Sequence, residues 1–78
     1  MSENTNYQKL KAFFQERFPE ANESILRLVA ENRLKGIGLQ EKLDEISPVT
    51  AEALINFFQT LSPEELQSLS FNALASVV

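Results

Sequence analysis

The chain has 78 residues, a formal charge of −4 and 44% hydrophobic residues, which suits one small soluble domain. It contains neither cysteine nor histidine, so disulfides are excluded, and zinc, copper and haem lose their usual ligands. Three prolines and two glycines leave little material for a turn-rich β fold. We therefore expect a single helical domain over residues 1–78, with a flexible N-terminus at residues 1–5.

The first part of the chain predicts two helices separated by a proline. Thr5 and Gln8 fit a capping box, and apolar residues then recur at three- and four-residue spacing over residues 6–18. Pro19 ends this helix, because the residue before a proline avoids the α region. It can also begin the next helix, where its missing N–H costs nothing. That second helix is expected to end near Lys35.

The second part predicts a short helix around Leu43 and two longer helices. Ser47 or Thr50 caps the first longer helix, and the pattern does not choose between them. Ser62 followed by Pro-Glu-Glu is the clearest helix start in the chain. The expected fold is all-α: a compact bundle of four to five short helices, arranged as two αα-hairpins joined by a short helix.

The segment Phe-Phe-Gln occurs twice, 44 residues apart (57 − 13), and each copy is followed by Pro-Glu. Between residues 10–20 and 54–64, six of eleven positions carry the same amino acid: Leu, Phe, Phe, Gln, Pro and Glu. Duplication of a helix pair and convergence on one kind of helix corner both explain the repeat. The spacing places Phe14 and Phe58 on the core stripes of their helices.

The sequence lacks the usual parts of an active site. No histidine or cysteine is present to activate a hydroxyl group, and one Gly-Ile-Gly at residues 36–38 is too short for a phosphate-binding loop. The carboxylates of Glu41, Asp44 and Glu45 do not have the spacing of a calcium loop. We predict that the protein is not an enzyme and uses no cofactor, metal ion or small-molecule substrate.

Charge is distributed unevenly along the chain. All seven basic residues lie in the first 42 positions, whereas residues 43–78 contain five acidic residues and no basic one. An acidic balance disfavours binding to nucleic acid. No stretch approaches the roughly 20 apolar residues that span a bilayer, and the N-terminal residues do not resemble a signal peptide. We expect a cytoplasmic protein with no membrane partner.

The C-terminal segment is the strongest candidate for a binding surface. Residues 66–78 include no charged side chain, and eight of these thirteen residues are apolar. A helix that is apolar on more than one face is either central in a bundle or covered by another chain. The predicted partner-binding residues are Phe57, Leu66, Leu69, Phe71, Leu74 and Val78.

Three functions fit these patterns. The first is a protein–protein interaction module, a small regulator or adaptor that presents its apolar C-terminal helix to another protein. The second is a self-associating structural subunit that uses the same helix as a homodimer interface. The third is an acidic inhibitor or nucleic-acid mimic, whose acidic surface occupies a basic site on a partner. In the first function, the acidic residues Glu52, Glu64 and Glu65 would steer a basic partner and so affect the association rate.

Overall fold

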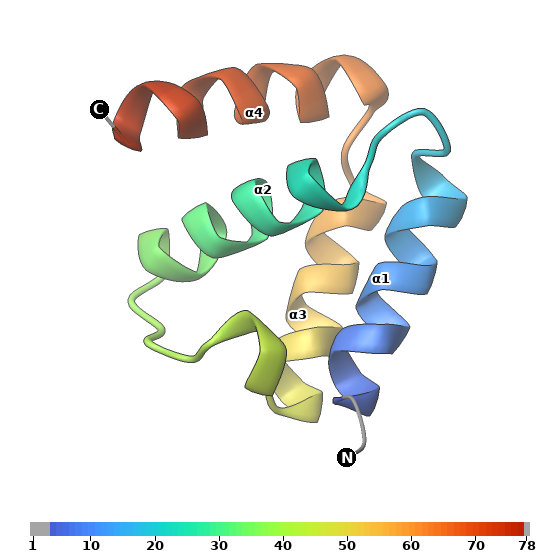
Figure 1. Ribbon diagram of the computed structural model, residues 1–78, viewed down its shortest axis with the longest axis vertical. Helices are drawn as coiled ribbons and strands as arrows, with labels where there is room; N and C mark the ends of the chain where they lie inside the picture. The colour runs from blue at the N-terminus through green and yellow to red at the C-terminus, as the bar shows by residue number, and fades with distance from the viewer. Residues whose placement is uncertain (1–3, 78) are drawn as a thin grey trace.

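The computed structural model describes residues 4–77, with side chains to Ala75, and every regular element in that range is helical (Figure 1). The all-α prediction is confirmed. The elements are α1 (Thr5–Arg17), α2 (Glu23–Gly36), the one-turn 3₁₀ helix η1 (Leu43–Glu45), α3 (Pro48–Gln59) and α4 (Pro63–Val77).

The first two helices begin at other residues than the sequence predicted. Asn4 caps α1, because its side chain accepts a hydrogen bond from the Tyr7 N–H at 2.8 Å, so the predicted cap at Thr5 is wrong. Pro19 does not begin α2. It lies in a turn, and Asn22 caps the helix three residues later. Asparagine satisfies an orphan N–H of the first helical turn, which proline in the first helical position cannot do.

The start of α4 agrees with the sequence, and at α3 the structure selects one of the two cap candidates that the sequence left open. Ser47 is the cap of α3, and its hydroxyl accepts from the Thr50 N–H at 3.2 Å. At α4, Ser62 N–H donates to the Glu65 carboxylate at 2.8 Å, and Glu65 N–H donates back to the Ser62 hydroxyl at 3.1 Å. This reciprocal pair is a capping box at the predicted helix start, and it fixes where α4 leaves the corner after α3.

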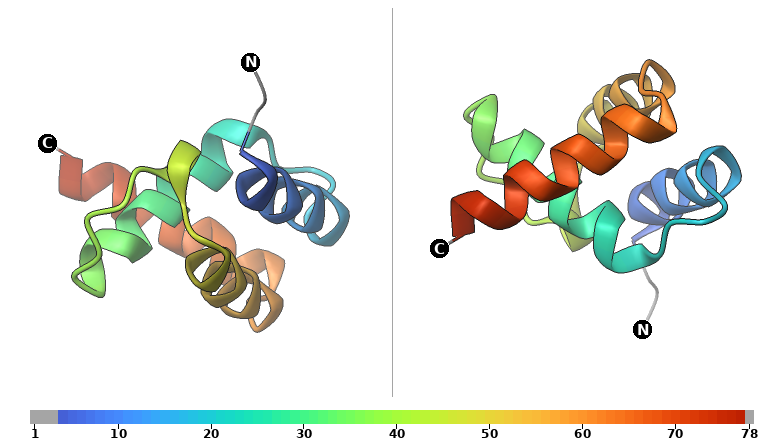
Figure 2. Two further views of the ribbon diagram at one scale, coloured as in Figure 1. Left: turned by 90° about the horizontal axis from the view of Figure 1, so that it is seen from below. Right: turned by 90° about the horizontal axis from the view of Figure 1, so that it is seen from above.

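Each helix packs mainly against the next helix but one. α1 and α3 lie side by side and run in the same direction, and α2 and α4 form the second closely packed pair (Figure 1). The predicted arrangement as two αα-hairpins fits only roughly, because consecutive helices are joined at corners but pack mainly against other helices. α4 crosses over α2 at one end of the molecule, which Figure 2 shows from two further directions. α4 is therefore an outer helix and not the centre of the bundle.

The two copies of the repeat meet in the core. Phe14 and Phe58, at equivalent positions, are fully buried, and their ring centroids lie 5.1 Å apart in an edge-to-face contact. Phe18 completes the cluster, with its centroid 5.2 Å from that of Phe14. The Arg17 guanidinium also donates to the Leu61 carbonyl at 2.8 Å, and these residues again lie 44 positions apart. Equivalent corners of the two copies are thus in direct contact.

We predict that Phe58→Ala lowers the free energy of unfolding by about 3–5 kcal/mol, because it removes an aromatic ring from a closed cluster and leaves a cavity. That loss is large beside the roughly 5–15 kcal/mol that stabilises a typical domain. Urea denaturation followed by far-ultraviolet circular dichroism measures it. The neighbouring exposed Gln59→Ala is the control and should change stability by less than about 0.5 kcal/mol. Equal losses in the two variants would contradict a core built on the repeat.

Candidate protein-interaction surface

The structure divides the predicted partner-binding residues of α4 between the core and the surface. Leu66 is only 5% exposed and belongs to the core, so little of its side chain is left for a partner in the folded chain. Leu69 is half-buried against the core. Phe71 and Leu74 are 73% and 57% exposed. Val78 lies outside the described residues.

Helical geometry explains this division. Leu66, Ser70 and Ala73 form the buried stripe of α4, and the Ser70 hydroxyl is satisfied by donating to the Leu66 carbonyl at 3.0 Å. At about 100° per residue, Phe71 and Leu74 lie on one flank of that stripe, whereas Leu69 lies on the other. The two apolar sets that make the tail unusual in sequence therefore face different surroundings.

Phe57 and Leu69 come together on the flank away from Phe71. With Val29 and Arg33 they line a shallow hollow of about 210 Å³. The Arg33 guanidinium carbon lies 4.5 Å from the centre of the Phe57 ring, a cation–π arrangement. Phe57 is thus half-buried and partly covered by a side chain of its own protein, so less of its ring is left for a partner.

A groove of about 460 Å³ opens on the Phe71 flank, between α4 and the corner that joins α1 to α2. Phe18, Ala21 and Ile25 line it from the corner, and Leu66 and Gln67 line it from α4. Sequence patterns did not reveal this groove, because residues from two distant segments form it only once α4 crosses α2. Ile25 lies one turn before the buried Val29 on α2 and is half-buried at the groove wall.

Phe71, Leu74 and the groove together form what we call the α4 surface. Gln67 is one helical turn before Phe71 and belongs to the groove wall, so the exposed ring stands next to the hollow. After Glu65 the α4 sequence carries no charge. The α4 surface therefore combines an apolar projection, a mainly apolar recess with Arg17 and Glu20 on its wall, and the absence of charged side chains along its helix.

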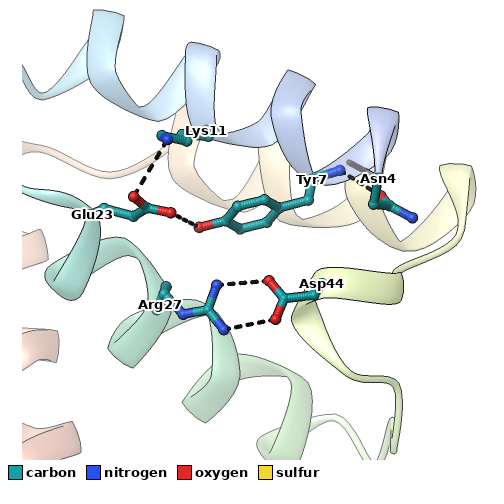
Figure 3. Close-up of polar contacts among 6 residues, drawn as sticks. All are labelled: Asn4, Tyr7, Lys11, Glu23, Arg27 and Asp44. Atoms are coloured by element: carbon teal, nitrogen blue, oxygen red, sulfur yellow. Dashed lines mark hydrogen bonds and ion pairs between the residues drawn. The ribbon is translucent and has the colours of Figure 1, made fainter. Parts of the chain in front are cut away.

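A cluster of polar side chains joins α1, α2 and η1 on another part of the molecule (Figure 3). The Tyr7 hydroxyl donates to the Glu23 carboxylate, and the Lys11 ammonium lies 3.4 Å from the same group. Arg27 forms two parallel hydrogen bonds with Asp44, at 2.8 and 3.2 Å. Such bidentate pairs fix orientation as well as distance, so this cluster positions α2 against η1.

Electrostatics in this polar cluster favour a structural role. Burial, followed by the hydrogen bond to Glu23, raises the pKa of Tyr7. The Tyr7 hydroxyl lowers the pKa of Glu23, and Arg27 lowers the pKa of Asp44. Each of these shifts moves the pKa of the group further from neutral pH, whereas a general acid or base works best with a pKa near the ambient pH.

The described residues were also searched for metal-binding groups and for membrane-spanning helices. Within the described residues, no group of three or more acidic, histidine or cysteine side chains is placed to hold a metal ion. In the same part of the chain, no helix has the length and apolar character needed to cross a membrane. A scan against protein-family models finds no match, and neither curated proteins nor solved structures give a significant match. The geometry of the α4 surface is therefore the basis for assigning function.

We predict that Tyr7→Phe destabilises the protein at neutral pH, because the Glu23 carboxylate loses its closest donor. A carboxyl group whose pKa is lowered by folding stabilises the folded state above its unfolded pKa, and this contribution disappears as the pH falls through the folded pKa. The difference between wild type and variant should therefore shrink on acidification. Urea midpoints at neutral and acidic pH measure it, and a difference independent of pH would contradict the assignment.

We also predict opposite outcomes for two aspartate substitutions on α4. Phe71→Asp should change the free energy of unfolding by less than about 0.5 kcal/mol, because the side chain is exposed. Leu66→Asp should unfold the chain, because it places a carboxylate in the core without a partner. Thermal melts followed by circular dichroism distinguish them. A strongly destabilised Phe71→Asp variant would show that Phe71 packs within its own chain.

Proposed function

We propose that the protein is a protein–protein interaction module, a small regulator or adaptor, that binds another polypeptide chain through the α4 surface. The observation that carries the proposal is the exposure of Phe71 beside an apolar groove. Aromatic side chains that fill pockets dominate the energy of many protein interfaces. A contiguous apolar surface with a polar rim is typical of such interfaces.

Two features of the rest of the described structure set the α4 surface apart: its hydrogen bonding and the positions of its exposed apolar residues. No buried side-chain nitrogen or oxygen atom lacks a hydrogen-bond partner among the residues that the structure describes. The other large exposed apolar residues lie elsewhere: Ile37 and Leu39 in the loop after α2, and Val49 in the first turn of α3. Only on α4 do an exposed aromatic ring, an exposed leucine and a groove adjoin within the described chain.

Binding by this surface would use helix packing. Phe71 and Leu74 are three residues apart and therefore project on one flank of α4, the spacing by which helices present anchors to a groove or to another helix. Glu64 and Glu65 at the start of α4 would affect mainly the rate of association with a basic partner.

The acidic-mimic alternative has less support from the contacts. Of the five acidic residues after Lys42, Asp44 is paired with Arg27, and Glu65 serves the cap of α4. The other three, Glu45, Glu52 and Glu64, belong to three different helices. An acidic surface built to replace a phosphate backbone would keep its carboxylates for the partner.

We predict that affinity capture from native lysate, read by mass spectrometry, recovers a binding chain with the wild type and loses it with Phe71→Asp. The new carboxylate would have to be desolvated against an apolar partner surface. The matched control is Asn72→Asp, which introduces the same charge one residue later, on an exposed part of α4 away from the groove. The control should retain the partner. Equal recovery with both variants, or no specific recovery by any of them, would overturn the proposal.

A further inference from the structure

We propose that the α4 surface is self-complementary and that its occupant is a second copy of this chain, with the two α4 helices packed antiparallel about a two-fold axis. This inference rests on the proposed function and names the partner of the same surface. In a two-fold interface each copy uses one patch, so whatever projects from the patch must fit a recess on the same patch.

The projection and the recess on α4 are related in the way that such an axis requires. Phe71 projects, and Gln67 forms part of the groove wall one turn earlier. In an antiparallel pair, an axis level with Leu69 places position 71 of one copy opposite position 67 of the other, since both lie two residues from the axis. Each Phe71 ring would then enter the groove of the other copy, beside Ile25 and Phe18.

Charge supports the antiparallel arrangement. Each chain carries a formal charge of −4, yet the sequence from Leu66 onward contributes none of it, so the contact between the two helices brings no like charges together. The groove wall adds one residue of each sign, Arg17 and Glu20. Glu64 and Glu65 lie at the first turn of α4. With the axis level with Leu69, antiparallel packing offsets the two Glu64–Glu65 turns by about 14 Å along the helix axis, which is beyond a Debye length of about 8 Å.

Head-to-tail stacking of copies is disfavoured by the opposite end of the bundle. That end carries η1, as Figure 1 shows, with exposed Asp44 and Glu45 and the preceding exposed Lys42. An apolar α4 surface packed there would have to strip water from these charges without replacing it. Between two α4 surfaces, only Arg17 and Glu20 on the groove wall carry charge, so less water has to be removed from charged groups. The same contact covers both the exposed ring and the groove.

The test is sedimentation of the full chain over a wide concentration range. Wild type should pass from monomer to dimer. Because each dimer contains the Phe71 contact twice, Phe71→Asp should weaken association by roughly 100-fold or more. Asn72→Asp should associate like wild type. Leu74→Ser, a milder change on the same flank, should give an intermediate dissociation constant, which keeps the test valid if Phe71→Asp folds poorly.

The orientation has its own test, because the chain contains no native cysteine. Gln67→Cys should be cross-linked to its counterpart by a short bis-maleimide, whereas Asn72→Cys, on the other flank, should not. A monomeric wild type at all concentrations, an unaffected Phe71→Asp dimer, or cross-linking through position 72 alone would overturn the inference. A monomer that still captures a different protein through Phe71 would leave the proposed function standing. If the wild type neither self-associated nor captured another protein, both the inference and the proposed function would be overturned.

Discussion

The edge-to-face contact between Phe14 and Phe58 is the interaction on which the architecture depends. These two rings occupy the same position in the two copies of the repeated segment, and both are fully buried. Their contact holds α1 beside α3, and the Arg17 to Leu61 hydrogen bond joins the same pair of corners. With these two helices fixed side by side, α2 and α4 leave their corners toward the same side and stack (Figure 1).

The stacking of α4 on α2 creates the α4 surface. α2 is covered by other elements of its own chain, including α4, whereas α4 is the last helix of the stack and keeps one flank exposed. The groove beside Phe71 exists because the corner after α1 stands next to the start of α4. The polar cluster of Tyr7, Glu23 and Arg27 contributes indirectly, since it holds α2 in the orientation that α4 crosses.

Local patterns predicted much of this fold and part of the surface. The cap at Ser62 depends on bonds between residues three positions apart, which a sequence shows directly. At α3 the sequence left Ser47 and Thr50 as alternatives, and the structure has Ser47. The errors at Thr5 and Pro19 came from competition between neighbouring cap candidates, since Asn4 and Asn22 supplied the bonds instead. Of the predicted surface, Phe71 and Leu74 are exposed as a binding role requires, while Leu66 proved to be core.

By itself, the sequence determined that the chain is helical, near which residues α3 and α4 begin, and that α4 has more apolar residues than one buried stripe can use. These properties follow from spacing along the chain, because helical periodicity and capping act over three or four residues. Only the tertiary structure decided which of those residues stay exposed and that a groove lies beside them. That outcome depends on contacts such as Phe14 with Phe58, 44 residues apart, whose geometry no local pattern contains.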